Sequence, residues 1–206
     1  MGNDRGFTEK KWDKSNFRRR IMRKIFLASS GQSRKTKDSY NDSFLEFLGR
    51  DPKGMRLAFI PTAEFPEKNK DFVEIIKNDL ATIGFEIKDI YLENESADSL
   101  YKELSEFDII FVSGGNTFYL LDQIRKSGFD KIIEKLLDEG KLYVGISAGS
   151  YIACPTIEVA TWKNDDSNVV KIKDLTGLNL VPFLLKAHYE PDKLPIIEKG
   201  VKKTNL

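Results

Sequence analysis

Ser147 is the residue whose surroundings best suit nucleophilic chemistry. It stands in the sequence Gly-Ile-Ser-Ala-Gly at 145–149, which fits the G-x-S-x-G pattern of a nucleophile elbow. An apolar run at 142–146 precedes the serine, and a helical pattern begins at Ala148. A sharp strand-to-helix turn here would project the hydroxyl above a sheet and place the Ala148 N–H to stabilise an oxyanion. The structural alternative is a tight turn in which the serine only caps the helix.

The single histidine of the chain, His188, is the candidate general base. A serine hydroxyl is a weak nucleophile unless a base lies within hydrogen-bond reach. Either His188 activates Ser147, or the base comes from another chain. The carboxylate that would orient the imidazole is not selected by spacing. Asp165 and Asp166, between the serine and the histidine, are our candidates, and a solvated loop is their alternative interpretation. Other carboxylates in the region are Glu158, Asp174, Glu190 and Asp192.

A pair of glycines follows another apolar run of the sequence. Ser113-Gly114-Gly115-Asn116 comes directly after 108–112, at the expected carboxyl end of a strand, where ligands bind in parallel sheets. We predict the Gly115 N–H as a second oxyanion donor, and Gly114 and Asn116 as substrate contacts. A plain glycine turn, with Asn116 capping the next helix, is the alternative. Phosphate binding is not favoured, because no G-x-G-x-x-G or Walker pattern is present.

Alternating strand and helix patterns must position these groups. Runs typical of strands lie at 24–30, 56–61, 85–92, 108–112 and 142–146. Helical spacing occurs at 39–48, 71–83, 98–104, 116–125, 129–139 and 148–153. The alternation predicts an α/β fold, a three-layer, doubly wound and mainly parallel sheet with helices on both faces. After Pro155 we expect a loop at 161–168, a strand or extended segment at 184–189, and a last helix at 196–203.

The composition excludes several classes of protein. The net charge of +1 argues against a dedicated nucleic-acid binder, and no apolar run approaches the ~18 residues of a membrane span. One cysteine, Cys154, allows no internal disulfide, which fits the cytoplasm, and we expect it to be buried packing. No motif calls for a metal or a cofactor. We expect residues 1–22 to be a basic, disordered extension and 23–206 to be one domain. An open sheet edge would invite a homodimer.

Three stretches together resemble the peptidase E (aspartyl dipeptidase) family of serine peptidases, which includes cyanophycinase-like members. They are FVSGGNTFYLL (111–121), YVGISAGSYIACPTI (143–157) and GLNLVPFLLKAHY (177–189), with IPTAE (60–64) as a weaker match. The resemblance implies a class I glutamine amidotransferase-like fold, with serine replacing the amidotransferase cysteine. It also implies that Ser147 is the nucleophile, His188 the base, and Gly115 and Ala148 the oxyanion donors.

The resemblance further implies hydrolysis of short peptides through an acyl-enzyme, with N-terminal aspartate as the family's best-known preference. Recognising aspartate would need a basic pocket. The family's acid lies between the serine and the histidine, or beyond the histidine. Residues 161–166 give no clean match to the first position, and the chain ends at Leu206, where the family usually continues, as a truncated copy would. An α/β-hydrolase-type esterase and a catalytically inactive binding protein are the alternatives.

Overall fold

The protein is seen in a computed structural model that describes residues 23–31, 37–67, 71–162, 166–189, 191 and 194–204. Within these ranges, the side chains of 37–40 and 202–204 are not described. The basic extension expected at 1–22 lies outside the described residues. Among the helices of the described ranges, none is both long enough and apolar enough to cross a membrane.

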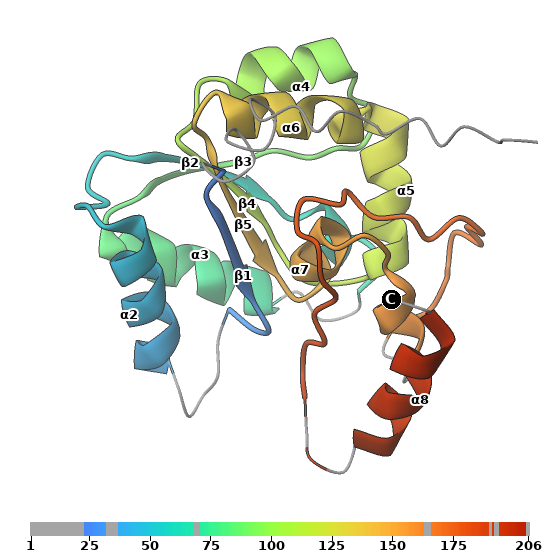
Figure 1. Ribbon diagram of the computed structural model, residues 1–206. Helices are drawn as coiled ribbons and strands as arrows, with labels where there is room; N and C mark the ends of the chain where they lie inside the picture. Colours follow the sequence, from blue (N-terminus) through green and yellow to red (C-terminus); the bar gives the residue numbers. More distant parts are fainter. Residues whose placement is uncertain are drawn as a thin grey trace, which may run out of the picture.

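A five-stranded parallel sheet forms the centre of the molecule (Figure 1). Its spatial order is β1-β5-β4-β2-β3, so the strands in the middle are β5, β4 and β2. The register pairs Val112 of β4 with Gly145 of β5, and Ala28 of β1 with Ile146 of β5. The strands are β1 (Ile25–Ala28), β2 (Arg56–Ile60), β3 (Glu86–Asp89), β4 (Ile109–Val112) and β5 (Leu142–Ile146). Because all strands run in one direction, their carboxyl ends meet along one edge of the sheet.

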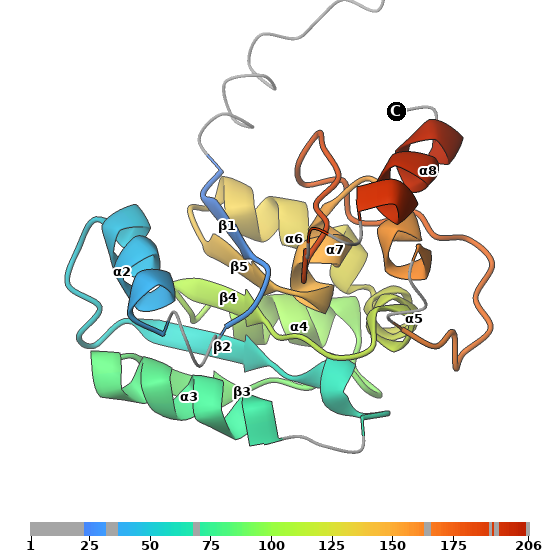
Figure 2. The ribbon, with the colours of Figure 1, turned by 90° about the horizontal axis from the view of Figure 1, so that it is seen from below.

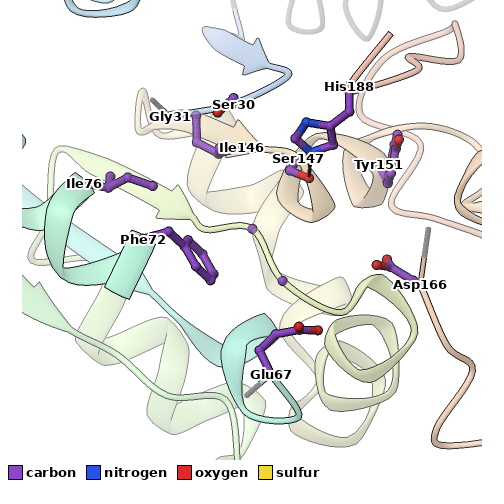
Figure 3. Close-up of a pocket in the computed structure, with 12 residues that line it drawn as sticks. Ser30, Gly31, Glu67, Phe72, Ile76, Ile146, Ser147, Tyr151, Asp166 and His188 are labelled. Atoms are coloured by element: carbon purple, nitrogen blue, oxygen red, sulfur yellow. Dashed lines mark hydrogen bonds between the residues drawn. The ribbon is translucent and has the colours of Figure 1, made fainter. Parts of the chain in front are cut away.

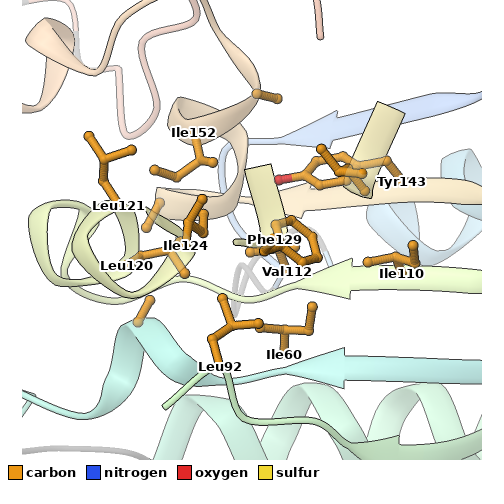
Figure 4. Close-up of a cluster of buried hydrophobic side chains, with 14 of the residues drawn as sticks. Ile60, Leu92, Ile110, Val112, Leu120, Leu121, Ile124, Phe129, Tyr143 and Ile152 are labelled. Atoms are coloured by element: carbon orange, nitrogen blue, oxygen red, sulfur yellow. The ribbon is translucent and has the colours of Figure 1, made fainter. Parts of the chain in front are cut away.

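Helices cover both faces of this sheet, and each face has its own apolar core (Figures 1 and 2). The larger core, drawn in Figure 4, joins the sheet to four helices through side chains such as Leu120, Phe129 and Ile152. These helices are α4 (Ala97–Leu104), α5 (Thr117–Ser127), α6 (Phe129–Asp138) and α7 (Ala148–Ala153). The opposite core packs α2 (Lys37–Leu48) and α3 (Asp71–Ile83) on the sheet. The predicted three-layer α/β fold is therefore confirmed.

The central strands are apolar on both faces because helices cover both. Every residue of β4 and of β5 is buried, as the continuous apolar runs predicted. The outer strand β3 alternates between exposed and partly buried residues and is shorter than the run at 85–92. Two further short helices, η1 (Thr62–Glu64) and η2 (Glu158–Thr161), lie in loops, and the last described element is α8 (Leu194–Thr204).

Residues 166–189, which we call the strap, carry no strand and no helix. The extended segment expected at 184–189 forms no strand. A single β-bridge, Thr156 to Thr176, involves the strap, which is also held by backbone hydrogen bonds to α7, by side-chain hydrogen bonds from α5 and by apolar packing on the larger core. The N–H groups of Leu178 and Leu180 donate to the carbonyls at the carboxyl end of α7 at 2.8 Å each. From this contact with α7 the strap runs back toward the carboxyl ends of the strands (Figure 2).

Candidate active site

The turns after β4 and β5 meet at the carboxyl edge of the sheet (Figure 3). Ser147 follows β5 directly and has φ 50° and ψ −105°, a conformation that few non-glycine residues adopt. Its N–H donates to the Ala28 carbonyl at 3.0 Å, and its carbonyl accepts the first hydrogen bonds of α7. The Ser147 side chain makes no capping hydrogen bond to the helix. The Ser147 hydroxyl therefore does not cap α7, which the alternative interpretation required.

The glycines of the 145–149 motif are required by close packing of backbone on backbone. A Cβ added at Gly149 would lie 2.1 Å from the Val112 carbonyl oxygen, and one at Gly145 would lie 2.6 Å from that of Gly149. Neither position can hold a side chain unless the backbone shifts. A Cβ at Gly114 would lie 3.2 Å from the Ser147 Cβ, so the glycine pair packs directly beside the serine.

The strap brings His188 to Ser147. Its Nε2 lies 2.9 Å from the Ser147 Oγ, within hydrogen-bond reach (Figure 3). His188 has φ 54°, and its N–H donates to the Ser29 Oγ at 2.8 Å. The N–H of the preceding residue, Ala187, donates to the Tyr151 hydroxyl at 3.1 Å. Tyr151 lies one turn after Ser147 on α7, so the helix that begins at the serine also holds the backbone beside the histidine.

The predicted carboxylates lie in different places. Asp165, Glu190 and Asp192 are outside the described residues. Asp166 lines the same pocket as Ser147 and His188, and its Oδ2 accepts a hydrogen bond from the Thr117 N–H at 2.8 Å. Asp174 is bound to Thr176 and Arg125, and the hydrogen bonds from Thr176 hold the pKa of its carboxyl below the usual value. Asp166 as the orienting acid stays a prediction.

The second predicted oxyanion donor, Gly115, has φ +134°, which favours glycine. A Cβ at this position would lie 2.3 Å from the Ala63 carbonyl oxygen, which accepts the Asn116 N–H at 2.7 Å. The Asn116 Oδ1 accepts the Tyr119 N–H and its Nδ2 donates to the Ser167 carbonyl. Asn116 is thus the helix cap that the alternative interpretation described, and it also ties α5 to the strap.

Sequence reasoning missed a polar network behind this turn. Glu93, from the loop after β3, accepts hydrogen bonds from the Thr62 hydroxyl at 3.1 Å and the Tyr119 hydroxyl at 3.2 Å. Burial, together with the nearby Glu93 charge, raises the pKa of Tyr119 to about 12. The network joins η1, which supplies the Ala63 carbonyl, to α5. Its three side chains are far apart in sequence, and no motif signals them.

Ser147 and His188 line a pocket of about 360 Å³. Its lining includes Gly114 and Gly115 beside the serine, Phe72, Ile76 and Ile146 on one side, and Glu67, Tyr151 and Asp166 elsewhere (Figure 3). No lysine or arginine lines this pocket within the described part of the chain. In the same ranges, no group of three or more His, Cys, Asp or Glu side chains could hold a metal ion. Cys154 is buried, which raises the pKa of its thiol, as expected of a packing residue.

Comparison with known proteins decides the family. The family model for peptidase family S51 matches residues 25–205, which is most of the chain. The chain belongs to peptidase family S51. Similar curated proteins include an uncharacterized peptidase of Pasteurella multocida, 34% identical over 181 residues, covering 88% of this chain and 83% of the relative. Peptidase E of a Nostoc species is 32% identical over 149 residues, covering 72% of this chain and 57% of the relative.

Two solved structures are similar to this chain in fold. A crystal structure assigned to peptidase E from Listeria monocytogenes has a TM-score of 0.75 and 34% sequence identity, covering 88% of this chain and 87% of that one. A peptidase from an acI-B1 actinobacterium, 18% identical with a TM-score of 0.58, shares the fold alone. The predicted resemblance to peptidase E and the class I glutamine amidotransferase-like fold are confirmed. The S51 chain is thus a hydrolase of the peptidase type.

Proposed function

We propose that this S51 chain is a serine peptidase that hydrolyses short peptides, with Ser147 as nucleophile and His188 as general base. The observation that carries the proposal is the 2.9 Å contact between the Ser147 Oγ and the His188 Nε2. The unusual backbone conformation at Ser147 supports it, because strained residues concentrate at functional sites. A pocket of about 360 Å³ has room for a peptide of a few residues.

The proposed reaction follows from the positions of these groups. The His188 Nε2 takes the proton from the Ser147 hydroxyl, and the oxygen attacks the carbonyl carbon of the scissile bond. The resulting oxyanion accepts hydrogen bonds from the N–H groups of Gly115 and Ala148, each worth about 3 kcal/mol of transition-state stabilisation. The C–N bond then breaks, and His188 gives its proton to the leaving amine. Water, deprotonated by His188, hydrolyses the ester and restores the Ser147 hydroxyl.

The His188 imidazole must be held in one orientation to act as the base in this scheme. Its backbone is held by Ser29, and that of the preceding residue by Tyr151. Asp165 or Asp166 would orient the imidazole in a complete triad. Asp166 lies in the pocket, and its Oδ2 accepts the Thr117 N–H, which leaves lone pairs on both carboxylate oxygens for a further donor.

Peptide hydrolysis by the purified chain tests the proposal. We expect the Ser147→Ala and His188→Gln variants each to lose about a thousandfold or more in kcat on any dipeptide that the wild type cleaves. Ser99→Ala, an exposed serine on α4, is the matched control and should keep the wild-type rate. Amine release measured by ninhydrin or by chromatography gives the rates. Wild-type turnover by Ser147→Ala would rule the proposal out.

A further inference from the structure

The turn at Gly115 is shaped by the short helix η1. Gly115 lines the pocket, and no described residue accepts a hydrogen bond from its N–H. Its backbone lies so close to η1 that an added Cβ would be 2.3 Å from the Ala63 carbonyl oxygen and 2.8 Å from the Glu64 nitrogen. The Ala63 carbonyl also accepts the Asn116 N–H at 2.7 Å. The direction of the Gly115 N–H therefore depends on where η1 lies.

Side-chain contacts fix the position of η1. The helix has only three residues and no side-chain cap, so its own backbone hydrogen bonds are few. Its first residue, Thr62, is buried. The Thr62 hydroxyl accepts the Leu92 N–H and donates to the Glu93 Oε2, at 3.1 Å each. Since Leu92 and Glu93 follow the outer strand β3, these contacts tie η1 to the edge of the sheet.

The Glu93 carboxylate also holds the helix on the other side of Gly115. Its Oε1 accepts the Tyr119 hydroxyl at 3.2 Å, and the Tyr119 N–H donates to the Asn116 Oδ1 at 2.9 Å. Burial and the Glu93 charge raise the pKa of Tyr119 to about 12, so its hydroxyl keeps the proton that it donates at neutral pH. Glu93 thus uses both oxygens to join η1 to α5, and Gly115 lies between these two elements.

We propose that Glu93 is a positioning residue, whose bridge between η1 and α5 holds Gly115 where its N–H meets the oxyanion. This inference rests on the serine-peptidase function proposed above. A donor stabilises the transition state only where it is already aimed at the developing charge, so movement of η1 relative to α5 slows the reaction. Binding of substrate and the basicity of His188 are unaffected, because Glu93 does not belong to the described lining of the pocket.

The rate at which a fluorophosphonate labels Ser147 measures this role, because the phosphoryl oxygen of the probe occupies the oxyanion position. We expect Glu93→Ala to lower the maximum labelling rate about thirtyfold, with the probe concentration for half-maximal rate within about threefold of wild type. The midpoint of the pH profile reports His188 and should not move. Glu93→Gln keeps an oxygen that can accept one of the two hydrogen bonds, and should recover part of the rate.

Matched variants separate this network from general loss of polar contacts. Tyr119→Phe removes one of the two hydrogen bonds to Glu93 and should slow labelling about fivefold. Tyr101→Phe removes a similar hydrogen bond, to Glu139, and Glu103→Ala removes a glutamate that binds Lys88. Both control residues lie on α4, and both controls should label at the wild-type rate. Circular dichroism establishes that each variant is folded.

The outcomes separate this inference from the proposed function. Labelling of folded Glu93→Ala at the wild-type rate would overturn the positioning role and leave the serine peptidase in place. A higher half-maximal concentration at an unchanged maximum rate would assign Glu93 to binding, and a shifted pH midpoint would assign it to His188; either result contradicts the inference. If Glu93→Ala does not fold, Tyr119→Phe decides in the same way. A wild-type Ser147 that the probe does not label would overturn the proposed function itself.

Discussion

The two halves of the candidate site are built in different ways. Ser147 follows the buried strand β5, and the glycines around it pack so closely that a Cβ at Gly149 would overlap the Val112 carbonyl. His188 lies on the strap, which has no helix or strand and is held by individual hydrogen bonds and by apolar side chains packed on the larger core. The sheet therefore fixes Ser147, whereas hydrogen bonds and apolar packing of an irregular segment fix His188.

This difference predicts where the site would open first. Segments with few regular hydrogen bonds and exposed residues open locally at lower free energy than buried strands. The Tyr151 hydroxyl, which receives the Ala187 N–H, joins the two halves because it belongs to α7 and contacts the strap. Changes on the sheet side should therefore affect stability and activity together, and changes at the contacts of the strap should affect activity more than stability.

The largest effect is expected from Gly115→Ala on the sheet side. The substitution puts a Cβ 2.3 Å from the Ala63 carbonyl oxygen at a residue with φ +134°, so the turn must move. We expect a loss of about 3 kcal/mol or more in the free energy of unfolding, measured by urea denaturation, and loss of peptidase activity. Both losses have one cause, because the same shift displaces the proposed oxyanion donor.

Gly54→Ala is the control for the free-energy cost of placing a side chain at a residue with positive φ. Gly54 has φ +76°, and a Cβ there would have no atom within 4 Å. This variant should lose only about 1 kcal/mol and keep its activity. Equal destabilisation by the two substitutions would mean that the close packing at Gly115 is unimportant and that the sheet side is less rigid than described.

A smaller effect is expected from Tyr151→Phe at the junction with the strap. The ring stays in place, but the buried Ala187 N–H loses its acceptor and His188 is held less firmly. We expect kcat/KM to fall about tenfold while the melting temperature falls by only a few degrees. Tyr101→Phe removes a hydroxyl that donates to Glu139 on the far side of the molecule and serves as control. A variant that loses stability in proportion to activity would contradict the contrast between the two halves.

The parts predictable from sequence are those governed by local pattern. The bounds expected for α3 and β5 match the structure, because a clear helical period or a continuous apolar run ends at polar or glycine residues, and α7 begins at Ala148 as expected. Ser147 could be singled out as a candidate from its spacing, and His188 by elimination, because the chain has one imidazole. Neither pattern fixes the contact between Ser147 and His188, because it depends on the path of the strap.

The parts that could not be predicted depend on side chains from distant segments. The network of Thr62, Glu93 and Tyr119 has no local signature, because each residue alone is a common surface type. The hydrogen bond from the Ala187 N–H to the Tyr151 hydroxyl has no local signature in the sequence for the same reason. The segment at 184–189 was expected to be a strand or extended, and its apolar residues instead pack beside the larger core without joining the sheet.

Chemical labelling of Ser147 tests the central claim most directly. A fluorophosphonate probe reacts with a serine only when a base activates it, so we expect mass spectrometry to find the label on Ser147 in the wild type. His188→Gln should slow labelling at least a hundredfold while leaving the protein folded. Labelling of Ser147 at the same rate in wild type and His188→Gln, or no labelling of the folded wild type, would contradict an activated serine–histidine pair.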